Sequence, residues 1–232
     1  MLNYFFFKKT INNTHFYIKD LKLMSKELNI SEDNAIIFDV GAHKGNEAQY
    51  INEYYPKAKI YCFEAVPEVF DNLNKRFDSI KNIKCQNLFL NDFKINEDIT
   101  INIDNNTDLV GSYYSKTDVT KTTDSKLIVK SDTLDNFSKN LDIKKIFFLR
   151  IDVNGYEKNV LLGAKNLLKE KQIDFVQVYF FNVLSKLEGG SLAEVTELLN
   201  KYDYRIMTFY NNFFHKKAFG GYYSALFVRS NF

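Results

Sequence analysis

The chain has 232 residues, of which 45% are hydrophobic and 26% charged, with a formal net charge of +2. That balance is typical of a globular domain with one sizeable core and excludes a disordered chain. The small net charge gives no indication of a surface for nucleic acid or anionic lipid. We find no membrane-spanning apolar stretch and no recognisable signal peptide. With only two cysteines, Cys62 and Cys85, we expect a cytoplasmic protein.

The first part of the chain alternates helices with strands. The spacing of apolar residues predicts an amphipathic helix over residues 14–28, within an N-terminal helical extension of residues 1–34. Apolar runs without polar alternation predict strands buried on both faces, at 35–40, 59–63 and 83–90. Helices are predicted between them, at 45–55 and 66–77. Because strand and helix alternate, we expect an α/β fold whose sheet is mostly parallel and covered by helices on both faces.

The middle of the chain departs from this alternation. Strands predicted at 99–103 and 127–130 bracket a polar loop, residues 104–125, that is long for a structureless connection. The loop is therefore either functional or mobile, and its tyrosines either lie over a substrate or fold back on the domain. Asp132 is predicted to cap a short helix that ends at Phe137.

The last part returns to strands and helices and closes with two consecutive strands. Further elements are predicted as a strand at 146–151, a helix at 156–170 and a strand at 173–180. Ser191 and Glu194 form a capping-box pair at the start of the last helix. Strands at 204–209 and 222–228 have no helix between them, which predicts an antiparallel C-terminal hairpin at one sheet edge. No repeat or linker divides the chain, so we expect one domain over residues 1–232.

Two glycines follow the first predicted strand and form a tight turn into the next helix. Gly41 and Gly45 are separated by three residues, and Asp39 precedes them. The fingerprint of nicotinamide dinucleotide sites would need glycine where this chain has His43 and Asn46, and there is no P-loop motif. Glycines in such a turn let the backbone approach a ligand. Asp39 and the nearby backbone suit a ligand with an amino-acid end, because a carboxylate can bind its ammonium group.

Glu64 ends the second predicted strand. Ligands of open α/β sheets bind beyond the carboxyl ends of the strands, and a carboxylate there can accept hydrogen bonds from both hydroxyls of a ribose. Alone, Glu64 could equally be a carboxylate that stabilises the start of the following helix. Together with Asp39, Gly41 and Gly45, it favours a nucleoside cofactor.

A third polar cluster runs from Arg150 to Glu157. Asp152 follows a buried strand and is expected to face the cleft, although it could also cap the next helix, and the two roles are compatible. Glu157 falls in the first turn of that helix, where a carboxylate stabilised by the helix dipole is the preferred interpretation.

The ordered set of motifs resembles the FkbM family of class I S-adenosylmethionine-dependent methyltransferases. The resemblance runs from about Ile36 to Phe180 and rests on segments 38–45, 63–67, 133–135, 151–157, 160–164 and 175–178. It implies a Rossmann-like class I methyltransferase fold. It also implies methyl transfer from S-adenosylmethionine, usually to a hydroxyl of a sugar or secondary metabolite.

The resemblance also implies which residues meet the cofactor and the acceptor. Residues expected at the cofactor are Asp39, Gly41, Ala42 and Gly45 around the methionine part, Glu64 and Ala65 at the ribose, and Asp92 near the adenine. Asp152 is the first candidate for orienting or deprotonating the acceptor. His43 is the second, because histidine titrates near neutral pH, although it could simply pack in the turn. No metal ion is expected.

Two positions depart from the family pattern. The family usually has Glu where this chain has Asn154, and again where it has Tyr179. Their loss removes candidate bases and substrate ligands, so a catalytically inactive binding protein with an altered acceptor site is the alternative function. A nucleic-acid methyltransferase is a weaker alternative, because no basic face is evident. We therefore expect a small-molecule or carbohydrate acceptor, with no nucleic acid and no membrane span.

Overall fold

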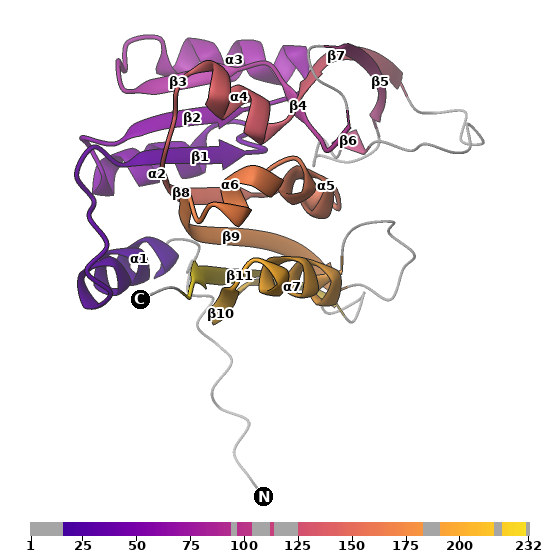
Figure 1. Ribbon diagram of the computed structural model, residues 1–232. Coiled ribbons are helices and arrows are strands. Elements are labelled where there is room, and N and C mark those ends of the chain that lie inside the picture. The colour runs from indigo at the N-terminus through magenta and orange to yellow at the C-terminus, as the bar shows by residue number, and fades with distance from the viewer. Residues whose placement is uncertain are drawn as a thin grey trace, which may run out of the picture.

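A computed structural model describes residues 16–93, 97–103, 112–113, 125–182, 191–215 and 220–230. A seven-stranded sheet lies at its centre, with the strand order β10-β11-β9-β8-β1-β2-β3 (Figure 1). These strands are β1 (Ile36–Val40), β2 (Lys59–Phe63), β3 (Ile83–Gln86), β8 (Ile146–Ile151), β9 (Ile173–Asn182), β10 (Tyr204–His215) and β11 (Gly220–Arg229). Neighbours from β3 to β9 are parallel, whereas β11 is antiparallel to both β9 and β10. The predicted parallel sheet and C-terminal hairpin are confirmed.

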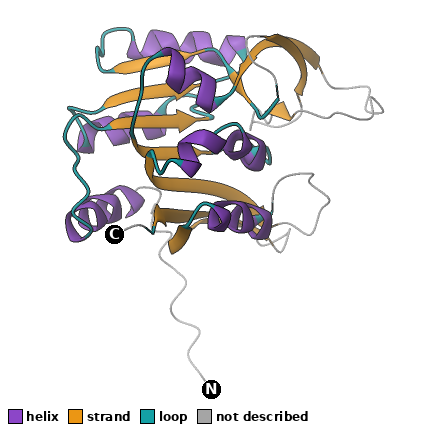
Figure 2. Cartoon of the chain, in the orientation of Figure 1, coloured by secondary structure: helices purple, strands orange, loops and turns teal. Residues whose placement is uncertain are grey.

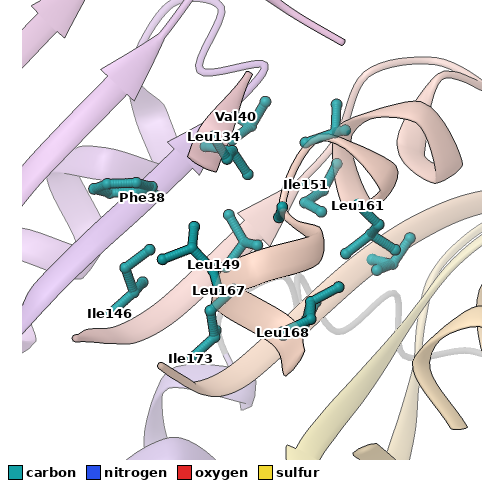
Figure 3. Packing of buried hydrophobic residues seen from close by; sticks show 14 of the residues in the cluster. Phe38, Val40, Leu134, Ile146, Leu149, Ile151, Leu161, Leu167, Leu168 and Ile173 are labelled. Atoms are coloured by element: carbon teal, nitrogen blue, oxygen red, sulfur yellow. The ribbon is translucent and has the colours of Figure 1, made fainter. Parts of the chain in front are cut away.

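Helices cover both faces of this sheet. The helices of one face are α1 (Phe16–Glu27), α2 (Asn46–Tyr54) and α3 (Pro67–Phe77), which share a core with Ile37, Ile60 and Phe148. The other face carries α4 (Leu134–Asn140), α5 (Glu157–Leu162), α6 (Lys165–Lys169) and α7 (Leu192–Lys201). Figure 3 shows part of this second core, where strand residues such as Leu149 meet Leu161 and Leu167. Burial on both sides explains why β1 and β8 are almost wholly apolar.

A smaller sheet follows β3 in the chain. Its strands are β4 (Phe89–Leu90), β5 (Glu97–Ile103), β6 (Ser112–Tyr113) and β7 (Ser125–Asp132), in the order β4-β7-β5-β6. Ile99 and Val129 pack with Val66, just after β2, and with Tyr156, just before α5. The small sheet therefore lies on the side toward which β1 points (Figure 2). Of the polar loop at 104–125, only β6 and Ser125 fall within the described residues.

Two predicted elements are interrupted in the structure: a strand ends early, and a helix is divided in two. The strand predicted over 83–90 ends at Gln86, because Phe89 and Leu90 pair with β7 of the small sheet instead. The helix predicted over 156–170 is divided between α5 and α6 around Gly163. A Cβ at Gly163 would lie 2.1 Å from the carbonyl oxygen of Asn91. The glycine therefore lets the chain between α5 and α6 pass close to the backbone of Asn91.

The helix caps were predicted with mixed success. Thr133, not Asp132, is the N-cap of α4: its side chain accepts from the Asn136 N–H, while Asp132 accepts from the Thr133 N–H. The capping box of Ser191 and Glu194 at the start of α7 is confirmed, with both reciprocal hydrogen bonds present. Among the described residues, no helix is long and apolar enough to cross a membrane.

Candidate active site

The turn between β1 and α2 is tied to the end of β2 through its backbone. Gly41 and Ala42 both donate their N–H groups to the carbonyl of Phe63, each at 3.0 Å. Gly41 has φ +83°, and a Cβ there would lie 2.0 Å from the carbonyl oxygen of Asp152. Glycine is therefore required here by the close approach of the β8 end as well as by the backbone angle. The turn and the ends of β2 and β8 form one unit.

Glu64 secures the same turn from the end of β2. Its Oε2 accepts from the His43 N–H at 3.0 Å, and its Oε1 accepts from the Val66 N–H at 2.9 Å. The carboxylate is 8% exposed, and its burial raises the pKa of Glu64, which the backbone donors oppose. Each carboxylate oxygen can accept a second hydrogen bond, so Glu64 retains capacity for ribose hydroxyls.

Asn87 and Arg76 hold the two sides of this unit, and neither was singled out in the sequence. The Asn87 amide donates to the carbonyls of Glu64 and Ala65, at 2.9 and 3.0 Å. Arg76 of α3 donates to the carbonyl of Lys44 and to Oδ1 of Asn46, across the start of α2. Both residues act on backbone turns, and no motif of fixed spacing marks them.

Helix α2 begins at a glycine that brings no capping side chain. Gly45 is the N-cap, with φ +79°, and a Cβ there would meet Phe77 and Leu73 of α3 at 2.4 and 2.7 Å. The first N–H groups of a helix carry partial positive charge and suit an anion such as a carboxylate. His43, in the same turn, is half-buried, and this burial lowers its pKa and favours the neutral imidazole.

Asp92 lies beyond the small strand β4. Its Oδ1 accepts from the Asn159 amide of α5 at 3.1 Å. The preceding Asn91 is buried, and its Oδ1 accepts from the Phe93 N–H at 2.8 Å. This segment is therefore held against α5, the helix that follows Asp152 in the chain.

A buried charge network crosses the ends of β1 and β8. Arg150 donates from Nη1 to Oδ1 of Asp39 at 2.8 Å and from Nη2 to Oδ2 of Asp152 at 2.7 Å. The side chains of Arg150 and Asp39 are 5% and 0% exposed, whereas that of Asp152 is 20% exposed. Tyr179 of β9 is buried, and its ring centroid lies 4.5 Å from the guanidinium carbon. Asp152 is thus the member of the network most accessible to solvent.

The connection from β8 to α5 is shaped by Glu157. Its Oε1 accepts from the N–H groups of Val153 and Gly155, at 3.2 and 3.0 Å. Asn154 is exposed with φ +53°, and Gly155 has φ +100°. Glu157 itself is buried, and this burial raises its pKa to about 7. Glu157 lies in the first turn of α5, as the sequence indicated, and from there it also holds the loop.

All but one of the predicted site residues fall into two groups at the carboxyl ends of the parallel strands. Gly41, Ala42, His43, Gly45, Glu64 and Ala65 share the turn at β1 and β2, while Asp39 and Asp152 meet through Arg150. Asp92 belongs to neither group, because it follows β4 of the small sheet and accepts from Asn159 of α5. Within the described part of the chain, no group of three His, Cys, Asp or Glu side chains is arranged to hold a metal. The contribution of Arg150 could have been suspected from its charge within an otherwise apolar strand.

Comparison with known families bears on this geometry. The model of the methyltransferase FkbM domain matches residues 39–206. The chain belongs to the FkbM methyltransferase family. The match begins at Asp39 and ends within β10, so it includes the carboxyl ends of β1, β2, β4 and β8. This FkbM protein is therefore an S-adenosylmethionine-dependent methyltransferase. A search of curated proteins gives no match.

Solved structures agree on the fold. An rRNA methylase from Streptococcus thermophilus has a TM-score of 0.53 at 10% identity, covering 92% of this chain and 95% of that one. Fibrillarin from Aeropyrum pernix, bound to S-adenosyl-L-methionine, has a TM-score of 0.51 at 12% identity, covering 89% and 74%. TrmK from M. capricolum, bound to S-adenosyl-homocysteine, has a TM-score of 0.50 at 13% identity, covering 94% and 69%. At these identities the likeness concerns the fold alone.

The residues at the strand ends fit S-adenosylmethionine. The buried Glu64 carboxylate has acceptor capacity for a ribose, and the uncapped start of α2 has donors for a carboxylate. Both lie beside the glycine turn, where a nucleoside and an amino-acid group of one ligand can be held together.

Proposed function

We propose that this FkbM methyltransferase acts on a hydroxyl of a sugar, glycan or other small metabolite. The observation that supports this most is the position of Asp152. Its carboxylate is partly exposed at the end of β8, next to the glycine turn, and is held in place by Arg150. A carboxylate so placed can orient a hydroxyl toward the methyl group and accept its proton. His43, kept neutral by burial, is the second candidate for this proton.

The cofactor would be held by the backbone-built half of the site. Glu64 would bind the ribose hydroxyls, the start of α2 at Gly45 would face the methionine carboxylate, and Asp92 would border the adenine. S-adenosylmethionine, when bound, supplies a methyl group on a positively charged sulfur. The protein contributes alignment and charge, since displacement at that methyl group needs an in-line approach.

A nucleic-acid acceptor has less support in this chain than a small molecule. The net charge is only +2, and the partly exposed side chain on the proposed acceptor side is the carboxylate of Asp152, paired with the buried Arg150. Binding along a phosphate backbone depends on clustered Lys and Arg. Salt-dependent binding of random oligonucleotides would favour the nucleic-acid alternative.

An inactive binding protein is the second candidate, and Tyr179 favours it. The family pattern expects a carboxylate at that position, whereas the Tyr179 ring is buried against Arg150. Burial also raises the pKa of Tyr179, so its hydroxyl stays protonated. Under this alternative the protein binds the cofactor without turnover.

The two candidates are separated by measuring S-adenosylhomocysteine release with a panel of sugars, glycans and hydroxylated metabolites. Release that needs an acceptor and is lost in Asp152→Asn supports the proposed activity. Cofactor binding without release from any member supports the inactive alternative. An exposed carboxylate elsewhere, changed in Glu68→Gln, is the matched control and is expected to retain release.

A further inference from the structure

Arg150 is the one cation of a polar row that crosses an otherwise apolar face of the sheet. Asp39 and Arg150 are register partners on β1 and β8, and Arg150 is paired in turn with Gln177 on β9. Asp152 follows Arg150 by two residues, and Tyr179 follows Gln177 by two. Because side chains alternate along a strand, both lie on the same face of the sheet as this row. Apolar side chains of α1, α2 and α3 pack on this face. A buried charge in such surroundings is costly unless its partners are fixed.

The arginine connects a residue that a ligand cannot reach with one that it can. Asp39 is 0% exposed, and Asp152 is 20% exposed. We propose that Arg150 is a positioning residue of the methyl-transfer site. The buried Asp39 holds the guanidinium in place and balances its charge, and the guanidinium in turn holds Asp152. This inference rests on the proposed role of Asp152. It also reassigns Asp39, which was expected at the cofactor, to an indirect role.

The geometry of the guanidinium explains why an arginine is needed. Its two terminal nitrogens bond to carboxylates from two different strands, and the Tyr179 ring lies against its face. Lysine has a single nitrogen and no planar face, so it cannot bridge both carboxylates while stacking on the ring. Arg150→Lys is therefore expected to keep the charge and lose part of the positioning.

The position of Asp152 affects both halves of the site. Its N–H donates to the carbonyl of Val40 at 2.9 Å, and its carbonyl oxygen lies 2.0 Å from where a Cβ of Gly41 would be. A shift of Asp152 would therefore disturb the glycine turn as well as the acceptor side. Loss of Arg150 is expected to weaken cofactor binding and to loosen the connection at residues 152–156.

The electrostatic surroundings predict a pH-dependent signature. Burial raises the pKa of Asp39, and the charge and hydrogen bond of Arg150 oppose that rise. Without the arginine, Asp39 loses this opposition and is expected to take up a proton at a pH where the wild type does not. The other titratable groups that interact with Arg150 or Asp39 lie on every element around the pair: Asp152 at the β8 end, Glu47 on α2, Tyr17 on α1, Tyr179 on β9, Cys62 on β2, Glu64 just after β2, and Cys85 on β3.

The test compares two double variants that each neutralise an ion pair. Asp39→Asn/Arg150→Gln removes the pair at the site without leaving an unpaired buried charge. Asp174→Asn/Arg229→Gln is the matched control, since Arg229 Nε bonds to the fully buried Asp174 at 2.6 Å near the start of β9, away from the site. Lys145, which also pairs with Asp174, is about half exposed and stays solvated in this variant. Two readouts are used: hydrogen exchange of the amides of Val153 and Gly155, and calorimetric affinity for S-adenosylmethionine. Thermal midpoints of both variants are recorded.

The expected result is faster exchange at both amides and a more than about tenfold loss of affinity in the site variant, with neither change in the control. The single variant Arg150→Gln should lose about as much as the double, because it already breaks the one chain of contacts, whereas Asp39→Asn, which keeps an oxygen that can accept from Arg150, should lose less. Arg150→Lys should recover part of the affinity. In Arg150→Gln, the affinity should also depend more steeply on pH than in the wild type, because Asp39 then takes up a proton at higher pH.

The proposal is overturned if exchange at Val153 and Gly155 is the same in the site variant as in the wild type, or if the single effects simply add. A wild-type protein that binds no S-adenosylmethionine would instead refute the proposed function. The exchange measurement would still decide whether Arg150 positions Asp152.

Discussion

The two halves of the proposed site are built in different ways. The half proposed to bind the cofactor joins the β1–α2 turn to the end of β2 mostly through backbone groups, such as the N–H groups of Gly41 and His43. The half proposed to bind the acceptor is a network of side chains from β1, β8 and β9, centred on Arg150. A backbone-built turn needs glycine at set positions, which a sequence displays. A side-chain network depends on strand register, which a sequence does not display.

Gly41→Ala tests the backbone-built half and has the largest expected effect. A Cβ there would meet the Asp152 carbonyl oxygen at 2.0 Å in a backbone conformation unfavourable for alanine. We expect a loss of at least about 2 kcal/mol in the free energy of unfolding, with loss of cofactor binding. Urea denaturation and calorimetry measure the two effects.

Gly45→Ala provides a graded comparison for that prediction. Its Cβ would meet the ends of the Leu73 and Phe77 side chains, which can move, rather than backbone. The loss of stability should therefore be smaller than for Gly41→Ala. Equal losses would indicate that backbone strain alone, and not the approach of β8, determines the need for glycine.

Asp152→Asn tests the side-chain half. Asparagine keeps an oxygen that can accept from Arg150 but cannot take a proton from a hydroxyl. We expect turnover with an acceptor to fall about 100-fold while cofactor affinity stays close to that of the wild type. Rates from S-adenosylhomocysteine release and affinities from calorimetry separate the two effects. A parallel loss of affinity would mean that Asp152 serves the cofactor instead.

Glu157→Gln sharpens the comparison through pH. Burial raises the pKa of Glu157 to about 7 from an ordinary value of 4.5, so the folded protein binds a proton more tightly than the unfolded chain. The stability that this residue contributes is therefore present below pH 4.5 and is lost as pH rises through about 7, by up to about 3 kcal/mol. Glutamine can still accept from the loop and does not titrate. Thermal midpoints at pH 5 and pH 8 should differ less in the variant than in the wild type.

Ser191→Ala has the smallest expected effect and lies outside both halves. It removes the capping box of α7, which costs about 1 kcal/mol of stability. Cofactor affinity and turnover should not change. A loss of affinity in this variant would show that global stability, and not local geometry, governs the binding measurements.

Much of the fold followed from local pattern, and the exceptions have physical reasons. Strands β2 and β8 have the predicted bounds because their apolar runs are buried on both faces. The predicted third strand extended too far because Phe89 and Leu90 are equally apolar in either sheet. The break at Gly163 depends on the distant backbone of Asn91, which no local pattern reports.

The site was predictable to a similar degree. The strand ends carrying Gly41, Glu64 and Asp152 could be placed because their motifs follow recognisable strands. The full burial of Asp39 could not, since it depends on Arg150, more than one hundred residues later in the chain. Asn87 was missed because its amide binds the backbone of another turn.

The most direct test of the account is a calorimetric titration of S-adenosylmethionine into the wild type, Glu64→Gln and the exposed control Glu68→Gln. Glutamine at position 64 would oppose one of the two backbone N–H donors with its own N–H₂ group and would lack the charge for the bonds that we propose to the ribose. The account predicts saturable binding by the wild type and the control, and at least about tenfold weaker binding by Glu64→Gln. No binding by the wild type, or equal binding by Glu64→Gln, would contradict it.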